Sequence, residues 1–171
     1  MLKPIVLGTF FLTSLACMAS ADEINIEGAT LSRDVHCTSS DVGISGVGNT
    51  ITLTGRCKSV QIYGTRHQVT FEAAEKVFVS GSANKVGGGT SQHLQVDLVD
   101  NEVRSTLKPG ADGPSTLNVT GNKNAVAVSL EGPAAIEVAG SDQKVTWTSG
   151  PSVAPPKVQI SGIKNSVKRG Q

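Results

Sequence analysis

The chain has 171 residues, with 15 basic side chains, 14 acidic side chains and 4% aromatic residues. This length fits a single domain, and the near balance of charge provides no long-range attraction for nucleic acid or an anionic membrane. We therefore expect no nucleic-acid partner, whereas an enzyme and a binding protein both stay open.

Residues 1–21 have the form of a secretory signal peptide. Lys3 is their only charged residue, an apolar run from Pro4 to Ala16 follows, and Ala19-Ser-Ala21 offers a small-residue cleavage site. The apolar run is short for a membrane span, and no later stretch is long enough for one. We predict cleavage after Ala21 and export to the periplasm or cell surface. Loss of Lys3 leaves 14 basic and 14 acidic side chains (15 − 1 and 14).

Cys17 supports a second interpretation of this segment. Ser14-Leu-Ala-Cys17 is similar to a lipoprotein box, although Leu is expected where Ser14 stands. Cleavage after Ala21 is favoured, and Cys17 would then leave with the signal peptide.

Residues 22–41 are predicted to form an N-terminal cap. Ile24-Asn-Ile-Glu-Gly28 is an incomplete version of the repeated phrase described below. Cys37 and Cys57 are separated by about one repeat in a chain expected in an oxidising compartment, so they are predicted to form a disulfide. A loop of this size corresponds to about 3 kcal/mol of stabilisation in the chain-entropy model. A metal pair is not favoured, because only His36 lies nearby and no fourth ligand is evident.

From residue 42 onward one phrase recurs seven times: apolar, any, apolar, any, Gly, two residues, Asn, any, apolar. It starts at Val42, Val60, Val77, Leu94, Leu117, Ile136 and Val158. Two short alternating strands and a turn at this period are typical of one coil of a β-solenoid. We predict an all-β, single-domain parallel β-solenoid (β-helix) of about seven coils, 17–23 residues each, over residues 42–171. Parallel crossovers favour a right-handed coil, although coils of this length also suit left-handed families.

The positions within the phrase divide into interior, turn and surface. In the first phrase Val42, Ile44, Ile51 and Leu53 alternate with small or polar residues and are predicted to point inward. Equivalent residues of successive coils should stack roughly 4.8 Å apart. The glycine of the phrase suits a corner with positive φ. Leu98 stands at this glycine position in the fourth phrase, and together with the long insertion after Arg104 it interrupts the regular pattern.

The amide position of the phrase follows the glycine by three residues. It is occupied by Asn49, His67, Asn84, Asn101, Asn124, Gln143 and Asn165. Stacked amides can hydrogen-bond along the axis and satisfy the carbonyl groups of turns, and His and Gln can also donate and accept. We predict a structural turn ladder in preference to a ligand-binding row of amides.

Two features lie outside the phrase. The third side of the coil is variable and lengthens at residues 105–116 and 148–157, as in solenoids whose irregular side binds a ligand. The chain ends soon after Val167 with Lys168-Arg-Gly-Gln171, and no cap is visible there. Because an uncapped solenoid exposes unpaired strand edges, self-association through the C-terminal end is a hypothesis.

The phrases Ile44-Ser-Gly-Val-Gly-Asn49-Thr-Ile-Thr-Leu53 and Val79-Ser-Gly-Ser-Ala-Asn84-Lys-Val86 resemble a bacterial family of short exported proteins. Its members carry repeats similar to SGSGNTVTV and form a domain of unknown function. The resemblance covers about residues 37–167 and implies a periplasmic or surface location. It carries no established activity, so no active-site residue is transferred.

A search for catalytic or metal-binding chemistry finds no strong motif. The three histidines have no recognisable nucleophile beside them, and Gly87-Gly-Gly-Thr90 lacks the lysine of a phosphate loop. Asp97, Asp100 and Glu102 form the densest acidic cluster; a weak calcium site is conceivable there, but a solvated turn is favoured. We therefore predict no catalytic residue, no metal and no cofactor.

An aromatic pair is the main candidate for a binding site. Tyr63 and Phe78 both fall on outward positions of consecutive coils, flanked by Gln61, Gln95 and Arg66. Aromatic side chains on a rigid surface can anchor protein or sugar partners. The sequence therefore predicts a non-enzymatic exported solenoid that binds a protein or glycan partner. Two alternatives are a carbohydrate-active enzyme of the β-helix type and a periplasmic inhibitor or immunity protein.

Overall fold

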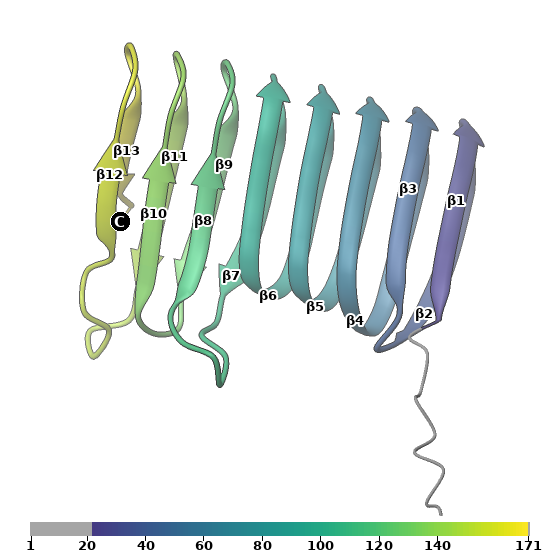
Figure 1. Ribbon diagram of the computed structural model, residues 1–171, viewed down its shortest axis with the longest axis horizontal. Coiled ribbons are helices and arrows are strands. Elements are labelled where there is room, and N and C mark those ends of the chain that lie inside the picture. The colour runs from purple at the N-terminus through teal and green to yellow at the C-terminus, as the bar shows by residue number, and fades with distance from the viewer. Residues whose placement is uncertain (1–21, 171) are drawn as a thin grey trace, which may run out of the picture.

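A computed structural model describes residues 22–170, and it consists of strands and turns. All of the strands join one parallel sheet that winds into a solenoid (Figure 1). The strands are β1 (Glu23–Ala29), β2 (Ser32–Thr38), β3 (Asp41–Val47), β4 (Thr50–Thr65), β5 (Gln68–Ser82), β6 (Lys85–Val99), β7 (Glu102–Leu107), β8 (Ser115–Val119), β9 (Ala125–Leu130), β10 (Ala134–Val138), β11 (Lys144–Ser149), β12 (Lys157–Ile160) and β13 (Ser166–Arg169). Residues 22–170 contain no helix, and thus none that could span a membrane.

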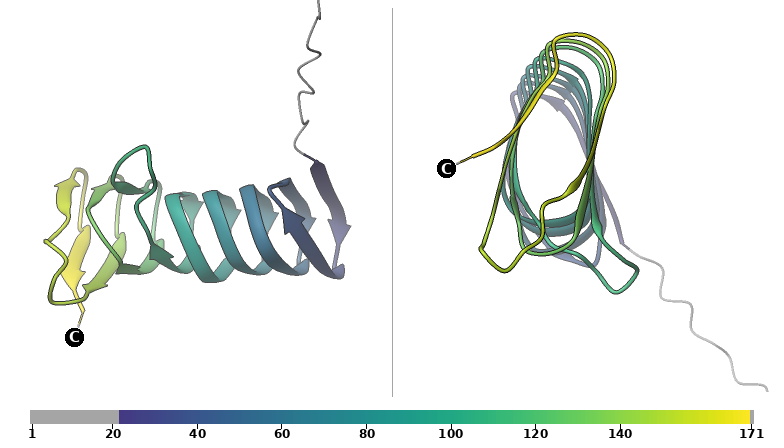
Figure 2. Two further views of the ribbon diagram at one scale, coloured as in Figure 1. Left: turned by 90° about the horizontal axis from the view of Figure 1, so that it is seen from below. Right: turned by 90° about the vertical axis from the view of Figure 1, so that its left-hand side faces the viewer.

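Each coil contributes one strand to a front row and one to a rear row. The front row consists of β1, β3, the second halves of β4, β5 and β6, and then β8, β10 and β12. The rear row consists of β2, the first halves of β4, β5 and β6, and then β7, β9, β11 and β13. Seen along the axis, the coils superimpose as a flattened oval (Figure 2). In Figure 1 the near strands run upward while the chain advances from right to left, so the coil is right-handed.

The solenoid has about 8 turns of about 18 residues, one turn more than the seven phrases predict. The additional turn is formed by residues 22–40, which the sequence predicts as a separate cap. β1 pairs with β3 from Glu23↔Asp41 to Ala29↔Val47, and β2 pairs with β4 in the same parallel manner. The predicted cap is therefore the first coil of the solenoid.

The interior is built from columns of aliphatic residues. Ile44 aligns with Ile62 and Val79 on the front row, and Ile51 aligns with Val69 and Val86 on the rear row. These side chains are at most 3% exposed. Each fully buried aliphatic side chain contributes roughly 1.5–3 kcal/mol, and the stacking explains how a chain with few aromatic residues forms a core.

Two backbone positions shape the turn between the front and rear rows. The glycine column, including Gly46, Gly64 and Gly81, has φ between 95° and 145°, which residues with a Cβ avoid. A Cβ at Gly81 would also overlap the carbonyl oxygen of Gly64 on the preceding coil. Two residues after each glycine, a second position adopts the left-handed region. Its occupants are Thr30, Gly48, Arg66, Ala83, Asp100, Lys123, Asp142 and Lys164, with φ of 55–68°.

The interruption expected after the fourth phrase does not break the solenoid. Leu98 aligns with Gly81 and occupies the glycine column with φ of 73°, while β6 pairs with both β7 and β8. The two insertions become loops, residues 108–114 and 150–156, which project beyond the oval at one end (Figure 2). They lengthen the coil without changing the register of the strands.

Candidate partner-binding face

The outward side chains of the front row form a flat surface, which we call the front face. Its central column aligns Gln61, Phe78, Gln95 and Asn118 on consecutive coils. Because parallel coils stack about 4.8 Å apart, these side chains form a regular row along the solenoid axis. The row contains amides and one aromatic ring, and the adjacent column adds Tyr63.

Tyr63 and Phe78 are in contact on the front face. Their ring centroids are 5.5 Å apart, with the planes tilted by 54°. Tyr63 is 44% exposed, while Phe78 is half-buried. The Tyr63 hydroxyl donates to Oε1 of Gln61 at 2.8 Å, which fixes the direction of this amide. An exposed ring held by a neighbouring ring and a hydrogen bond is a preorganised contact surface.

A shallow hollow of about 260 Å³ lies beside Phe78. Gln61 and Gln95 border it, and Lys76, His93, Thr116 and Asn118 also contribute. His93 Nδ1 lies 2.9 Å from Oγ1 of Thr116, so these two polar groups are already paired. The residues that line this hollow include no carboxylate. Lys76 and His93 were missed because they precede each phrase by one residue and only the register between coils brings them beside Phe78.

Arg66 does not join this hollow. It lies past Gly64 in the turn, at the left-handed position with φ of 58°, and its side chain is exposed. It borders neither the hollow beside Phe78 nor the neighbouring one of about 180 Å³ that Gln61 and Tyr63 share with β1 and β3. Arg66 therefore lies outside the lining of both hollows, and its role beside the aromatic pair stays a prediction.

The N-terminal part of the front face is acidic. Glu23, Glu27 and Asp41 line the second hollow. The Ser59 hydroxyl donates to Oδ1 of Asp41 at 2.5 Å, and Nζ of Lys58 lies 3.5 Å from Oδ2. The Ser59 hydrogen bond is the main cause that lowers the pKa of Asp41; burial opposes this shift, and the Lys58 charge adds to it. This carboxylate therefore stays ionised at neutral pH.

The amide column is buried and does not face a ligand. Asn84, Asn101, Asn124 and Gln143 are at most 1% exposed, and each backbone N–H in the column donates to the side chain one coil further on. The donor–acceptor distances are 3.1 Å from Asn84 to Asn101, 2.9 Å from Asn101 to Asn124 and 3.0 Å from Asn124 to Gln143. The column thus acts as a turn ladder along the solenoid.

His67 fits the ladder as a neutral ring. Its Nδ1 accepts from the Asn49 backbone N–H at 3.1 Å, and its Nε2 lies 3.1 Å from the Tyr63 carbonyl oxygen, which can only accept. These partners require a proton on Nε2 and none on Nδ1. The ladder therefore uses this histidine as an amide substitute.

The acidic cluster is divided by a turn. Asp97 lies on the front face, where it accepts from Gln95 and Thr120, whereas Glu102 lies on the rear row and pairs with Arg104 at 2.8 Å. Asp100 occupies the turn between them. Within residues 22–170 no group of three or more His, Cys, Asp or Glu side chains is placed to hold a metal ion. The three carboxylates of the acidic cluster are therefore not brought together as ligands of one calcium ion.

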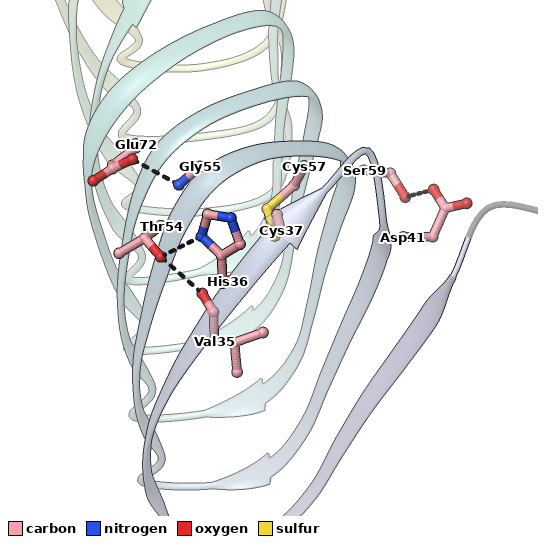
Figure 3. The surroundings of a disulfide bond; sticks show 9 residues. All are labelled: Val35, His36, Cys37, Asp41, Thr54, Gly55, Cys57, Ser59 and Glu72. Atoms are coloured by element: carbon pink, nitrogen blue, oxygen red, sulfur yellow. Dashed lines mark hydrogen bonds between the residues drawn. A yellow bond between two sulfur atoms is a disulfide. The ribbon is translucent and has the colours of Figure 1, made fainter.

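Cys37 and Cys57 form a disulfide between the first two coils, with Cα atoms 4.9 Å apart (Figure 3). Nearby, His36 Nδ1 lies 3.1 Å from Oγ1 of Thr54, and the Gly55 N–H donates to Oε2 of Glu72 at 2.6 Å. Both cysteines are at most 2% exposed. A buried disulfide near the N-terminal end supports folding in an oxidising compartment. The signal peptide itself and Cys17 lie outside the described residues.

A further hollow of about 550 Å³ lies between the two long loops. Its walls are mainly proline and alanine, with Pro109 and Pro114 from one loop and Ala154 and Pro155 from the other. Lys157 is the one charged side chain of this lining.

Comparison with known proteins finds a match to a family of unknown function. Residues 44–105, from β3 to β7, match the model of a family described as a protein of unknown function (DUF3060). No curated protein and no solved structure matches the chain. Over these residues the chain is thus similar to an uncharacterised repeat-protein family, in agreement with its β-solenoid fold.

Proposed function

We propose that the chain is an exported, non-enzymatic binding protein whose front face holds a protein or glycan partner in the periplasm or at the cell surface. The observation that carries the proposal is the Tyr63–Phe78 pair beside a hollow bordered by Gln61 and Gln95. Aromatic rings supply contact area at low entropic cost, and amides both donate and accept hydrogen bonds.

The polar groups of the hollow favour a glycan over a protein. A sugar presents hydroxyl groups that donate and accept, and the hollow offers two glutamines, Asn118 and Thr116 as partners with the same ability. The row of amides also continues along the axis from β4 to β8, which suits an elongated chain of sugar units. Lys76 is the one fixed charge of the lining, so an acidic sugar would gain additional attraction.

The enzyme alternative is less well supported by this hollow. Glycoside hydrolysis by the usual mechanisms requires a placed pair of carboxyl groups, and the lining of the hollow contains none. The inhibitor alternative would use the same aromatic pair against a protein surface, where exposed tyrosines commonly dominate binding energy. Self-association through the C-terminal end is a separate proposal, developed below.

Binding to immobilised glycans tests the proposal. The double variant Tyr63→Ser/Phe78→Ser should lose at least about tenfold in affinity, because aromatic anchors at interface centres are each worth about 2 kcal/mol or more. Thr52→Ser/Thr70→Ser changes two outward residues of the rear row and should bind like the wild type. Equal binding by both double variants would refute the assignment of the front face. Capture of only protein partners, lost in the same variant, would support the inhibitor alternative.

A further inference from the structure

The two ends of the solenoid carry unpaired strand edges. Within residues 22–170, β1 and β2 pair only with β3 and β4, and β12 and β13 pair only with β10 and β11. Unpaired edges of parallel strands are templates for another chain. A partner that continues the solenoid would present strands that run in the same direction.

The C-terminal edge exposes core-type side chains. Val158 and Ile160 are 40% and 53% exposed, although they align with Ile136 and Val138, which are at most 1% exposed in the preceding coil. Ile163, at an outward turn position beside them, is 67% exposed. The N-terminal edge presents the half-buried Ile24, Leu31 and Val35. Both ends thus offer apolar surface that a further coil would cover.

The charges of the two ends are opposite. Residues 157–170 contain four basic side chains, Lys157, Lys164, Lys168 and Arg169, and no acidic one. Residues 22–34 contain four acidic side chains, Asp22, Glu23, Glu27 and Asp34, against Arg33. Two C-terminal ends would repel each other, as would two N-terminal ends, whereas a C-terminal end and an N-terminal end attract.

We propose that the C-terminal end of one copy binds the N-terminal end of a second copy, with the strands continuing in register. Lys157 belongs to the column that begins with Glu23, and Lys168 belongs to the column that begins with Asp34. A continued stack would therefore place Lys157 opposite Glu23 and Lys168 opposite Asp34 of the second copy. The same register places Val158 on Ile24, so that charge and apolar contacts agree in one arrangement.

Three features keep this association reversible. At the C-terminal end Arg169 aligns with Trp147, and the Arg169 guanidinium lies 5.3 Å from a ring centroid of Trp147. At the N-terminal end Arg33 aligns with the buried Ile51. Inward-pointing charges at sheet ends oppose edge pairing. The amide ladder also stops at the junction, because Asn165 ends it and Leu31 stands at the amide position of the first coil. One turn of about 18 residues per side is slightly smaller than a standard interface of about 20–30 residues.

Analytical ultracentrifugation of the purified protein over a concentration series at low salt tests the proposal. The wild type should show head-to-tail association that weakens as salt is added. Lys157→Glu/Lys168→Glu and Glu23→Lys/Asp34→Lys should each weaken self-association at least about tenfold, because like charges then meet at the junction. An equimolar mixture of the two variants should associate again, since each reversed end meets a complementary one.

A wild type that stays monomeric at low salt and the highest attainable concentration would overturn the proposal, as would charge variants that associate like the wild type. Ile160→Ser provides a second variant that leaves the charges unchanged and should also weaken association. All five positions are exposed or lie on exposed strands, and thermal unfolding checks that each variant folds. The proposal is independent of the front face: Ile160→Ser, which changes an interior column at the C-terminal end, should weaken association but still bind glycan, whereas Tyr63→Ser/Phe78→Ser should still associate.

Discussion

At the scale of single residues, the amide of Asn101 shows what the ladder contributes. Its Oδ1 accepts from the Asn84 N–H at 3.1 Å, and its Nδ2 donates to the carbonyl oxygens of Gly81 at 3.0 Å and Asp97 at 2.8 Å. One buried side chain therefore satisfies three backbone groups on two coils. Leaving such groups unpaired in the interior costs about 1–3 kcal/mol each.

Asn101→Ala should destabilise the protein by about 3 kcal/mol or more, because it leaves these backbone groups without partners. Chemical denaturation measures the change. Asn118→Ala, an exposed asparagine on the front face, is the matched control and should change stability by less than about 0.5 kcal/mol. Equal effects of the two substitutions would contradict the structural role of the ladder.

His67 performs the ladder function with one donor fewer than asparagine. The Asn49 side chain donates to the carbonyl oxygens of both Gly28 and Ser45, whereas the His67 ring donates only to the Tyr63 carbonyl oxygen. His67→Asn should supply a second donor for the carbonyl group of Gly46 and raise stability by roughly 0.5–1.5 kcal/mol. His67→Ala should lower it, and thermal unfolding compares both. A loss of stability in His67→Asn would show that the ring packs in a way that the amide cannot replace.

The lowered pKa of Asp41 predicts a dependence on pH. A carboxyl group with a lower pKa in the folded state stabilises the fold above its unfolded pKa of about 3.9, and this contribution is lost as the pH falls through the folded pKa. In Ser59→Ala the pKa of Asp41, followed by NMR, should rise toward its ordinary value. An unchanged pKa would mean that Lys58 is the main cause.

At the scale of elements, the alternation of the strands could be read from the sequence, but the first coil could not. Val42, Ile44 and their equivalents repeat at regular intervals, which is sufficient to predict stacked strands. In the first coil Leu31 replaces the ladder amide and Arg33 occupies an interior column, so the phrase is hidden there although the backbone follows it. The left-handed turn position also escaped prediction, because residues as different as Thr30, Ala83 and Lys123 occupy it.

Leu98 tests the role of the glycine column. A residue with a Cβ in the left-handed conformation destabilises the fold by roughly 1–2 kcal/mol. Glycine removes this strain but loses more chain entropy on folding, which costs roughly 0.5–1 kcal/mol. Leu98 is 52% exposed and loses little burial, so Leu98→Gly should stabilise the protein by up to about 1 kcal/mol. Leu98→Ala keeps the Cβ and should not stabilise it. A lower melting temperature for Leu98→Gly than for Leu98→Ala would contradict this account.

At the scale of the whole molecule, the repeated phrase builds a rigid scaffold and the exceptions to it carry the proposed functions. The glycine column shapes the turns, the amide column is buried beneath them, and the aliphatic columns fill the interior. The aromatic pair could be predicted because period-two alternation places Tyr63 and Phe78 outward. The surrounding hollow could not, because His93 and Thr116 meet only through the register of β6 and β8.

The most direct test of this account compares glycan affinity with stability in one variant. Tyr63→Ser/Phe78→Ser should lose at least about tenfold in affinity, while its melting temperature shifts only slightly, because the pair contributes roughly 0.5–1.5 kcal/mol beyond its burial. A binding isotherm on the folded variant gives the answer. Reduced affinity with a retained fold is the predicted result, and undiminished affinity would contradict a binding function for the front face.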